Sequence, residues 1–426
     1  MKKVLIITYY WPPAGGPGVQ RWLKFVKYLP EFGIEPIVYC PENPNYPIMD
    51  TSMVSEVSST LEVIQAPINE PYKLAQLLSR SKTSDLSKGI ITGQKKQTIT
   101  EKILLFVRGN FFIPDARVSW VKPSVSFLSD YIKTHKIDTI ITTGPPHSLH
   151  LIGLKLKQLY SLQWIADFRD PWTQIGYHKK LKLTALSKRK HDQLESSVLR
   201  NSDEIIVTSP QTKVLFSKRT TTQITVITNG YDFEINHSCT LDSMFTLSHV
   251  GSLYEGRNPQ VLWKVLSDLV QTSKEFSKVF RLNLIGYVSQ DVLQSIKSYG
   301  LEAHTNCSGY VSHSEALTYQ NKTQLLLLIE EDSIETQYII PGKLFEYMAS
   351  KRPIISIGPD VSDIEDILSK SCAGTYFRYK DAELLRLGIS NHFEAYKMND
   401  LNVDSKGLGY YSRKSLTLEL SKILIN

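Results

Sequence analysis

Apolar strand-like runs alternate with longer amphipathic segments along nearly the whole chain, and this pattern restricts the possible folds more than any other feature of the sequence. In the first half, the strand-like runs cover residues 4–9, 36–40, 139–142, 163–166 and 204–208, and the helical patterns between them include 20–32, 149–160 and 184–201. Such alternation is typical of a doubly wound parallel sheet. The sequence therefore predicts an α/β fold.

The alternation stops at a polar stretch after the Asn229-Gly230 turn and then starts again. The second series of strands covers residues 246–250, 281–285, 325–329 and 354–357, with helices at 259–272, at 291–299, from about 314 and at 412–425. A chain of 426 residues is too long for one compact core of ordinary size. We therefore expect two Rossmann-like domains facing each other across a cleft, residues 1–235 and 236–408, and a C-terminal helical segment, 409–426, that crosses back to the first domain.

Composition indicates a soluble globular protein, with 42% hydrophobic and 21% charged residues. No apolar run approaches the ~18 residues of a membrane span. The four cysteines lack metal-site or disulfide spacing, so we expect a reducing, cytoplasmic location. The formal charge of +7 favours an anionic partner without choosing between a nucleotide, a membrane surface and nucleic acid. Because the basic residues are dispersed and no recognition module is visible, nucleic acid is the least favoured.

The segment from Pro341 to Ile355 has the pattern of a loop, a short amphipathic helix and a strand. Lys343 and Glu346 lie three residues apart, so they share one face near the start of this helix. Free N–H groups and the positive end of the helix dipole favour an anion there. We expect Lys343 to lie beside a phosphate and Glu346 to accept hydrogen bonds from hydroxyl groups such as those of a ribose. The alternative is an ordinary surface Lys–Glu pair.

Other loops also follow predicted strands, at the edge where open α/β sheets bind ligands. Gly15 and Gly16 precede the first helix without the dinucleotide fingerprint or the lysine of a phosphate-binding loop, which disfavours a dehydrogenase or a kinase. Arg257 comes just before the helix at 259–272, where it could bind a phosphate bidentately. His147 and Asp170 follow two further strands. The alternative for the glycine loop is a tight turn, and for Arg257 it is a purely structural role. His147 and Asp170 could instead be ordinary solvent-exposed side chains.

Together these motifs resemble the retaining, nucleotide-sugar-dependent glycosyltransferases of family 4, which have the GT-B fold. The resemblance covers nearly the whole chain, and the motifs occur in that family's order: Gly15-Gly16, His147, Ile227-Thr228-Asn229-Gly230, the loop from Gly251 to Arg257, Gly309-Tyr310-Val311 and the stretch from Pro341 to Ala349. The last motif is the most specific, and it resembles enzymes of bacterial surface-polysaccharide assembly.

The resemblance implies roles for individual residues. Arg257 and the residue at the position of Ser252 would contact the diphosphate, and Glu346 would hold the ribose. The Tyr310-Val311 segment would lie along the base, and His147 would contact the transferred sugar. The expected donor-binding residues are Gly15, Ser252, Arg257, Gly286, Tyr310, Val311, Ile340, Gly342, Lys343 and Glu346, and the expected catalytic residues are His147, Gly16 and Asp170.

The chain departs from the family's pattern in two places. Many members carry two glutamates separated by seven residues, and Tyr338 stands at the first of these positions. Glu335 and Gln337, in the same loop, are the candidates to replace the missing carboxylate. Ser252 stands where an arginine is usual, which leaves the lysine and the arginine already named as the expected phosphate partners.

The resemblance implies a metal-independent enzyme of class EC 2.4. It would move a sugar, with retention, from a nucleotide-diphosphate sugar to a lipid-linked glycan acceptor in cell-surface polysaccharide biosynthesis. The nucleotide sugar is a substrate, and we expect no cofactor. Basic segments at 178–183 and 188–190 would contact an anionic membrane on its inner face, and an insertion at 83–108 would contact the membrane surface or an apolar acceptor. The alternatives are a solvated helix face for the basic segments and, for the insertion, an ordinary surface loop leading into a core helix. The rival functions are a nucleotide-sugar epimerase or hydrolase of the same fold and a non-catalytic nucleotide-sugar-binding protein.

Overall fold

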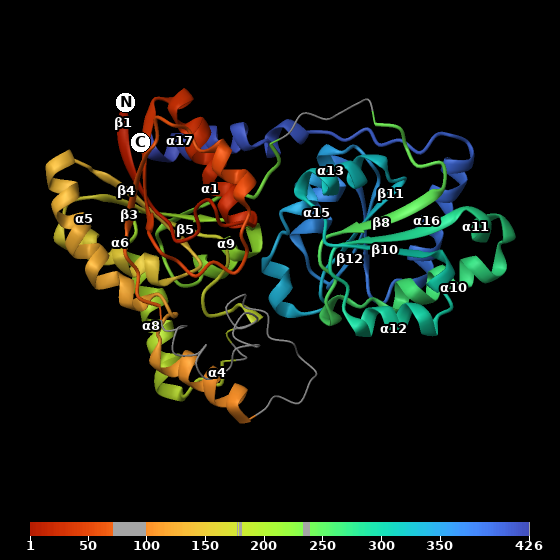
Figure 1. Cartoon of the computed structure of the whole chain (residues 1–426), viewed down its shortest axis with the longest axis horizontal. Coiled ribbons are helices and arrows are strands. Elements are labelled where there is room, and N and C mark those ends of the chain that lie inside the picture. The colour runs from red at the N-terminus through yellow and green to blue at the C-terminus, as the bar shows by residue number, and fades with distance from the viewer. Residues whose placement is uncertain (71–98, 177, 179–180, 233–238, 426) are drawn as a thin grey trace. The chain divides into compact units, whose positions relative to one another are not determined.

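The computed structural model describes residues 1–70, 99–176, 178, 181–232 and 239–425 (Figure 1). The chain forms two compact units. Unit 1 consists of Met1–Asn229 and Arg413–Asn426, and unit 2 of Gly230–Ser412. The chain leaves unit 1 six residues before the boundary expected at 235, and it returns four residues after the one expected at 408.

Unit 1 contains a seven-stranded sheet in the order β3-β2-β1-β4-β5-β6-β7, and every neighbouring pair is parallel. Its strands are β1 (Lys2–Ile7), β2 (Ile34–Pro41), β3 (Glu62–Ala66), β4 (Thr139–Gly144), β5 (Gln163–Phe168), β6 (Glu204–Val207) and β7 (Gln223–Val226). Its helices are α1 (Pro17–Tyr28), α4 (Ile99–Phe111), α5 (Val121–His135), α6 (Ser148–Leu159), α8 (Ala185–Asn201), α9 (Pro210–Ser217) and α17 (Arg413–Ile425). The strand order changes direction between β1 and β4, which is where doubly wound sheets bind ligands.

Unit 2 contains a six-stranded parallel sheet in the order β10-β9-β8-β11-β12-β13. Its strands are β8 (Phe245–Val250), β9 (Phe280–Ile285), β10 (Thr305–Gly309), β11 (Leu325–Ile329), β12 (Ile354–Gly358) and β13 (Gly374–Arg378). Its helices are α10 (Gln260–Thr272), α11 (Lys274–Val279), α12 (Gln290–Ser298), α13 (His313–Lys322), α14 (Lys343–Ala349), α15 (Asp363–Ser371) and α16 (Ala382–Lys397). These two sheets confirm the predicted α/β class with two Rossmann-like domains.

The central strand β11 shows why the apolar runs of the sequence are continuous rather than alternating. Leu325, Leu327 and Ile329 pack into one hydrophobic cluster of unit 2, and Leu326 and Leu328 pack into another. All five residues are buried. Because helices cover both faces of a parallel sheet, each position of such a strand must be apolar.

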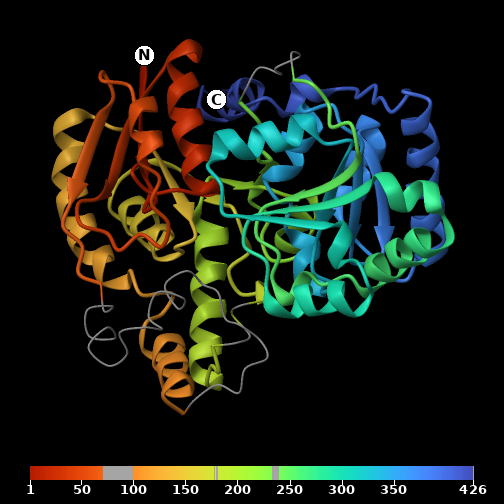
Figure 2. The same cartoon turned by 45° about the vertical axis from the view of Figure 1, so that its right-hand side comes forward.

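The C-terminal helix α17 packs against α1 and belongs to unit 1, although it follows unit 2 in the chain. Both cartoon views show the blue C-terminal helix beside the red α1 (Figures 1 and 2). Lys2 Nζ also donates a hydrogen bond to the Leu424 carbonyl, at 2.6 Å. The leucines of α17 share a core cluster with residues of β1 and α1: Leu416, Leu420, Leu424, Val4, Ile6, Trp22, Leu23 and Phe25.

Several elements of the structure were not among those expected from the sequence: helices α5, α9, α11, α15 and α16 and strand β13. The helix expected over 20–32 is α1 followed by a 3₁₀ turn, Leu29–Phe32, because Pro30 cannot continue an α-helix. The edge strands β3 and β10 were not predicted, because few of their residues are buried and their apolar pattern is weak. Among the described residues, no helix is both long enough and apolar enough to cross a membrane.

Candidate functional site

Lys343 opens α14 in unit 2, and its side chain reaches back to the end of β8. Its Nζ lies 3.2 Å from His249 Nε2. His249 is fully buried, and its Nδ1 lies 3.0 Å from the Leu327 carbonyl of β11. A carbonyl only accepts, so Nδ1 carries the ring proton and Nε2 accepts a hydrogen bond from Lys343.

The ionisation of both residues is strongly perturbed. Burial, and then the nearby Arg257 cation, lowers the pKa of Lys343 to about 7, against the opposing effect of Glu330 and Glu346. Burial, and then Lys343, also lowers the pKa of His249 well below its usual range. The histidine is therefore neutral at physiological pH, while the lysine titrates there.

Arg257 lies in the 3₁₀ turn η4 (Glu255–Arg257) and pairs with a buried carboxylate. Its Nη2 is 3.3 Å from Glu330 Oε2, and the Glu330 side chain is only 1% exposed. The second carboxylate oxygen, Oε1, is buried and has no hydrogen-bond partner in the described parts of the chain. Glu330 directly follows β11, and its role was not predicted, since a Glu-Glu pair after a strand resembles an ordinary exposed loop.

Glycines bring the ends of β8, β9 and β10 close together. Gly251 and Gly286 have φ values of +122° and +125°, and Gly286 N donates to the Gly309 carbonyl at 2.7 Å. A Cβ at Gly286 would lie 2.6 Å from the Gly251 carbonyl oxygen, and one at Gly251 would lie 3.4 Å from Lys343 Nζ. The positive φ of Gly251, and not this ordinary van der Waals distance to the lysine, favours glycine at that position. Ser252 follows it and is half-buried.

Both oxygens of Glu346 already have partners from α13. Oε1 lies 3.1 Å from His313 Nε2, and Oε2 accepts a hydrogen bond from Gln320 at 3.2 Å. Immediately before α13, Tyr310 is 86% exposed and Val311 is half-buried. The residues expected to hold a base and a ribose are therefore linked through α13. His313 and Gln320 were not predicted, because their spacing is that of any polar helix face.

The remaining residues expected around the donor are more ordinary. Ile340 is part of the core, and Gly342 precedes α14, which has only seven residues. Glu335, Gln337 and Tyr338 lie together in the 3₁₀ turn at Ile334–Tyr338, and all three side chains are half-buried. Nothing in this turn selects one of them as the replacement for the missing glutamate.

In unit 1, His147 precedes α6 and is 3% exposed. Its ring stacks on Trp172, with centroids 5.1 Å apart and planes 3° from parallel. Neither ring nitrogen has a hydrogen-bond partner among the residues that the structure describes. Burial, and then His150, lowers the pKa of His147 well below its usual range. His147 is therefore a neutral, buried side chain whose polar atoms could accept or donate one hydrogen bond each.

Arg169 joins the predicted loops of unit 1. It donates hydrogen bonds to the Gly144 carbonyl at 3.2 Å and to the Pro145 carbonyl, just before His147. A Cβ at Gly18 would lie 1.5 Å from its Nη1, so the glycine loop approaches the same guanidinium. Sequence reasoning did not select Arg169.

The other two predicted catalytic residues lie next to Arg169 and Gly18. Asp170 is half-buried, and burial raises its pKa against the opposing effect of Arg169. Gly16 has a φ of +108°, and a Cβ there would meet no atom within 4 Å, so open space lies beside it. Gly15 N donates to the Ile48 carbonyl at 3.0 Å.

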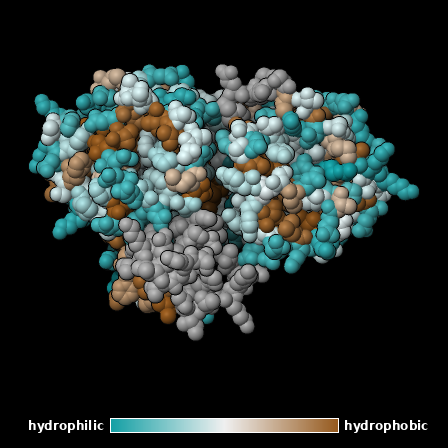
Figure 3. All heavy atoms as spheres, in the orientation of Figure 1, coloured by the Kyte–Doolittle hydropathy of each residue, from teal (hydrophilic) through white to brown (hydrophobic). Residues whose placement is uncertain are grey.

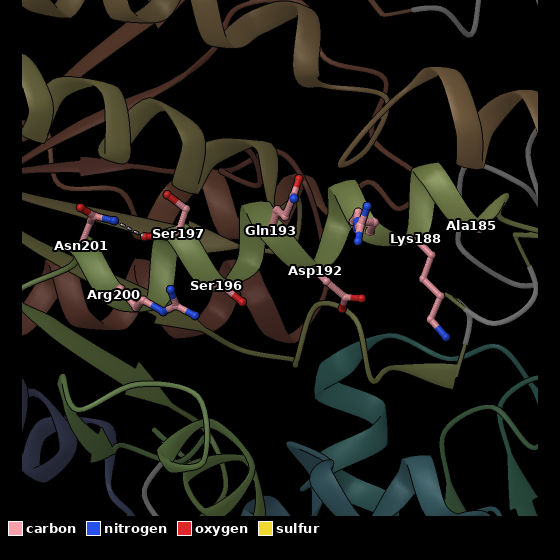
Figure 4. A pocket seen from close by; sticks show the side chains of 9 residues that line it. Ala185, Lys188, Asp192, Gln193, Ser196, Ser197, Arg200 and Asn201 are labelled. Atoms are coloured by element: carbon pink, nitrogen blue, oxygen red, sulfur yellow. Dashed lines mark hydrogen bonds between the residues drawn. The ribbon is translucent and has the colours of Figure 1, made fainter.

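A groove of about 640 Å³ runs along one face of α8 in unit 1 (Figure 4). It is lined by Ala185, Lys188, Arg189, Asp192, Gln193, Ser196, Ser197, Arg200 and Asn201. None of the predicted site residues lines this groove. The candidate site is therefore defined by the side chains described above, and the groove is not part of it. Within the described ranges, no group of three or more His, Cys, Asp or Glu residues could hold a metal ion.

The two parallel sheets define a GT-B fold, and comparison with solved structures agrees. Over 100% of its length, the chain is similar to a glycosyltransferase from Rickettsia africae ESF-5, with 12% identity, 99% of that chain covered and a TM-score of 0.64. It is likewise similar over 100% of its length to sucrose-phosphate synthase from Thermosynechococcus elongatus, with 14% identity, 98% of that chain covered and a TM-score of 0.62. It is also similar over 100% of its length to HepE from Anabaena in complex with UDP-glucose, with 12% identity, 100% of that chain covered and a TM-score of 0.61. No protein-family model and no curated protein matches the sequence. At these identities the likeness establishes the fold.

Proposed function

We propose that the protein is a retaining glycosyltransferase of family 4 that transfers a sugar from a nucleotide-diphosphate sugar to a glycan acceptor. The observation that carries the proposal is the group of residues at the C-terminal ends of the unit 2 strands. There, Lys343 lies beside the strand-end glycine Gly251, and Arg257 is close enough to lower the pKa of Lys343. Two cations at a glycine-lined backbone suit the two phosphates of such a donor.

Glu346 and α13 extend this site toward a nucleoside. The carboxylate of Glu346 would exchange its bonds to His313 or Gln320 for the hydroxyl groups of a ribose. The exposed Tyr310 ring would lie along the base. HepE, which has the same fold, binds UDP-glucose, and this supports a nucleotide sugar as the donor.

The two cations also suit the chemistry of transfer. As the bond from the sugar to the diphosphate breaks, negative charge develops on the leaving phosphate, and Arg257 and Lys343 would stabilise it without a bound metal. In a retaining reaction, the same phosphate would help to remove the proton of the attacking acceptor hydroxyl. In unit 1, His147, whose ring nitrogens have no hydrogen-bond partner in the described ranges, would contact the transferred sugar.

The α4–α8 surface of unit 1 suits a lipid-linked acceptor at an anionic membrane. We define this surface by four exposed apolar side chains and three cations: Ile103, Phe106, Phe111, Leu186, Lys182, Lys188 and Arg189. Asn110 holds its two helices together, because it donates to the Lys182 carbonyl at 3.3 Å and accepts from Thr184 N at 2.8 Å. Apolar side chains beside cations are typical of helices that lie in a membrane interface.

Part of this α4–α8 surface can be followed in the figures. Brown atoms are visible where α4 lies (Figure 3). Residues 83–98 of the expected insertion, and Lys179 and Lys180 of the expected basic segment, lie outside the described residues. The proposal places the protein in the cytoplasm, peripheral to the inner face of the membrane, in the assembly of cell-surface polysaccharide.

A donor panel tests the proposed function. Thermal shift with UDP-, GDP-, ADP- and dTDP-sugars would select the donor, and turnover would then be measured with and without lipid-linked glycans. Glycosyl transfer only in the presence of acceptor supports the proposal. Equal consumption of the donor without acceptor would indicate an epimerase or hydrolase, and binding without turnover over all acceptors would indicate a non-catalytic binding protein.

A further inference from the structure

His249 is a candidate positioning residue that the family resemblance does not assign. We propose that His249 positions Lys343 for the diphosphate, and that this Lys–His pair takes up one proton when a nucleoside diphosphate binds. The inference rests on the proposed function, because it concerns the same site. It adds a named residue and a measurable change in protonation.

The geometry fixes which atom of His249 can act. The ring is fully buried, and its Nδ1 is held 3.0 Å from the Leu327 carbonyl in the neighbouring strand. Nε2 is therefore a fixed acceptor that faces Lys343 Nζ at 3.2 Å. One of the three N–H directions of a protonated lysine would point at the histidine, and two would be left for phosphate oxygens.

Titratable groups from four elements face Lys343. His249 approaches from β8, Arg257 from η4, Glu330 from the end of β11, and Glu346 from α14 itself. Glu330 pairs with Arg257 at 3.3 Å, and Glu346 is bonded by His313 and Gln320, so both carboxylates are engaged elsewhere. Burial, and then the Arg257 cation, outweigh the two carboxylates and lower the pKa of Lys343 to about 7.

A diphosphate reverses this balance. Its negative charges favour the protonated lysine, so the pKa of Lys343 rises on binding. At about pH 8 the lysine of the nucleotide-free protein is mostly neutral, and binding should draw close to one proton from the buffer onto Nζ. Near pH 7 the uptake should be about half a proton, and below about pH 6 it should vanish, because the lysine is already charged.

Calorimetry measures this proton directly. Wild-type protein is titrated at pH 8 with UDP, GDP, ADP and dTDP, and the tightest of the four is repeated in two buffers of different ionisation enthalpy. At this pH the terminal phosphate is already ionised, so the ligand contributes no proton. The inference predicts that the binding enthalpy depends on the buffer, with a slope near one proton. It also predicts that the slope disappears in Lys343→Met.

Variants of His249 separate positioning from packing. His249→Leu removes the acceptor and should weaken nucleotide binding about tenfold or more at pH 6, whereas His249→Gln keeps an acceptor oxygen and should recover most of the affinity. Melting temperatures of both variants control for unfolding. A buffer-independent enthalpy in the wild type, or His249→Leu binding as tightly as the wild type, would overturn the inference alone. Absence of binding by all four nucleotides would overturn the proposed function as well.

Discussion

Arg257 Nη2 lies 3.3 Å from the carboxylate of Glu330, which is buried to 1% exposure in unit 2. Sequence motifs predicted a phosphate-binding role for Arg257, and the structure adds a carboxylate that holds the guanidinium in place. The other carboxylate oxygen, Oε1, is buried and has no hydrogen-bond partner among the described residues.

Removal of either member of this pair should affect stability and binding differently. Arg257→Met leaves a buried carboxylate unpaired, so it should lower the free energy of unfolding by about 1–3 kcal/mol and also abolish tight nucleotide binding. The double variant Arg257→Met, Glu330→Gln should regain most of the stability but not the binding. Urea unfolding and nucleotide titration measure the two effects. Full binding by the double variant would contradict the role of Arg257.

Gly286 should tolerate no side chain. Gly286→Ala would combine a φ of +125° with a Cβ 2.6 Å from the Gly251 carbonyl, and it should lower the melting temperature by several degrees. Gly300→Ala is the matched control, because Gly300 has a φ of +70° but open space around its Cβ, and it should cost only about 1 kcal/mol. Equal losses in the two variants would show that the close approach of the β8 and β9 ends is unimportant.

Lys343 should make stability depend on pH. Its pKa of about 7 in the folded state lies below the ordinary value of 10.5, so between these values the unfolded chain binds more protons than the folded one. The contribution of Lys343 to the free energy of unfolding therefore increases as pH rises through this window. Below about pH 7 the lysine is protonated in both states, and this increase is absent. Between pH 7 and 9, the wild type should gain melting temperature relative to Lys343→Met. Melting temperatures of the two proteins that change in parallel with pH would contradict the lowered pKa of Lys343.

The α4–α8 surface should bind vesicles that contain phosphatidylglycerol more tightly than vesicles of phosphatidylcholine alone. Phe106→Ser with Phe111→Ser should weaken binding at least about tenfold, through loss of apolar insertion. Lys188→Glu with Arg189→Glu should do so through charge, at ~1 kcal/mol for each cation lost. Leu384→Ser with Leu387→Ser, on exposed positions of α16, is the control. Vesicle co-sedimentation unaffected by both pairs of substitutions would rule out this surface.

The sequence was most informative where burial alone determines structure. The run Leu325–Ile329 predicts a strand because five consecutive apolar residues have the length of a buried strand, and the strand-end glycines predict close approach of backbone to a ligand. Edge strands such as β10 could not be predicted, since exposed residues carry little periodic pattern. The α/β class and its two Rossmann-like domains followed from the alternation of strands and helices.

The site itself was only partly predictable. Lys343 and Arg257 could be selected because cations next to strand-end loops have few structural uses. Glu330 and His249 could not, because their importance lies in burial and in contacts between strands that are distant in the sequence. Arg169 was likewise overlooked, although it joins the Gly18 loop to the Gly144 carbonyl in unit 1.

Nucleotide binding by the paired cations tests the central claim most directly. Wild-type protein, the double variant Arg257→Met, Lys343→Met and the control Lys264→Met, on an exposed position of α10, would be titrated calorimetrically with UDP, GDP, ADP and dTDP. We predict that the wild type and the control bind one of the four with equal affinity, and that the double variant binds at least about 100-fold more weakly, since each charged hydrogen bond contributes ~1.5–3 kcal/mol. Unchanged affinity in the double variant, or no binding by the wild type, would contradict the account.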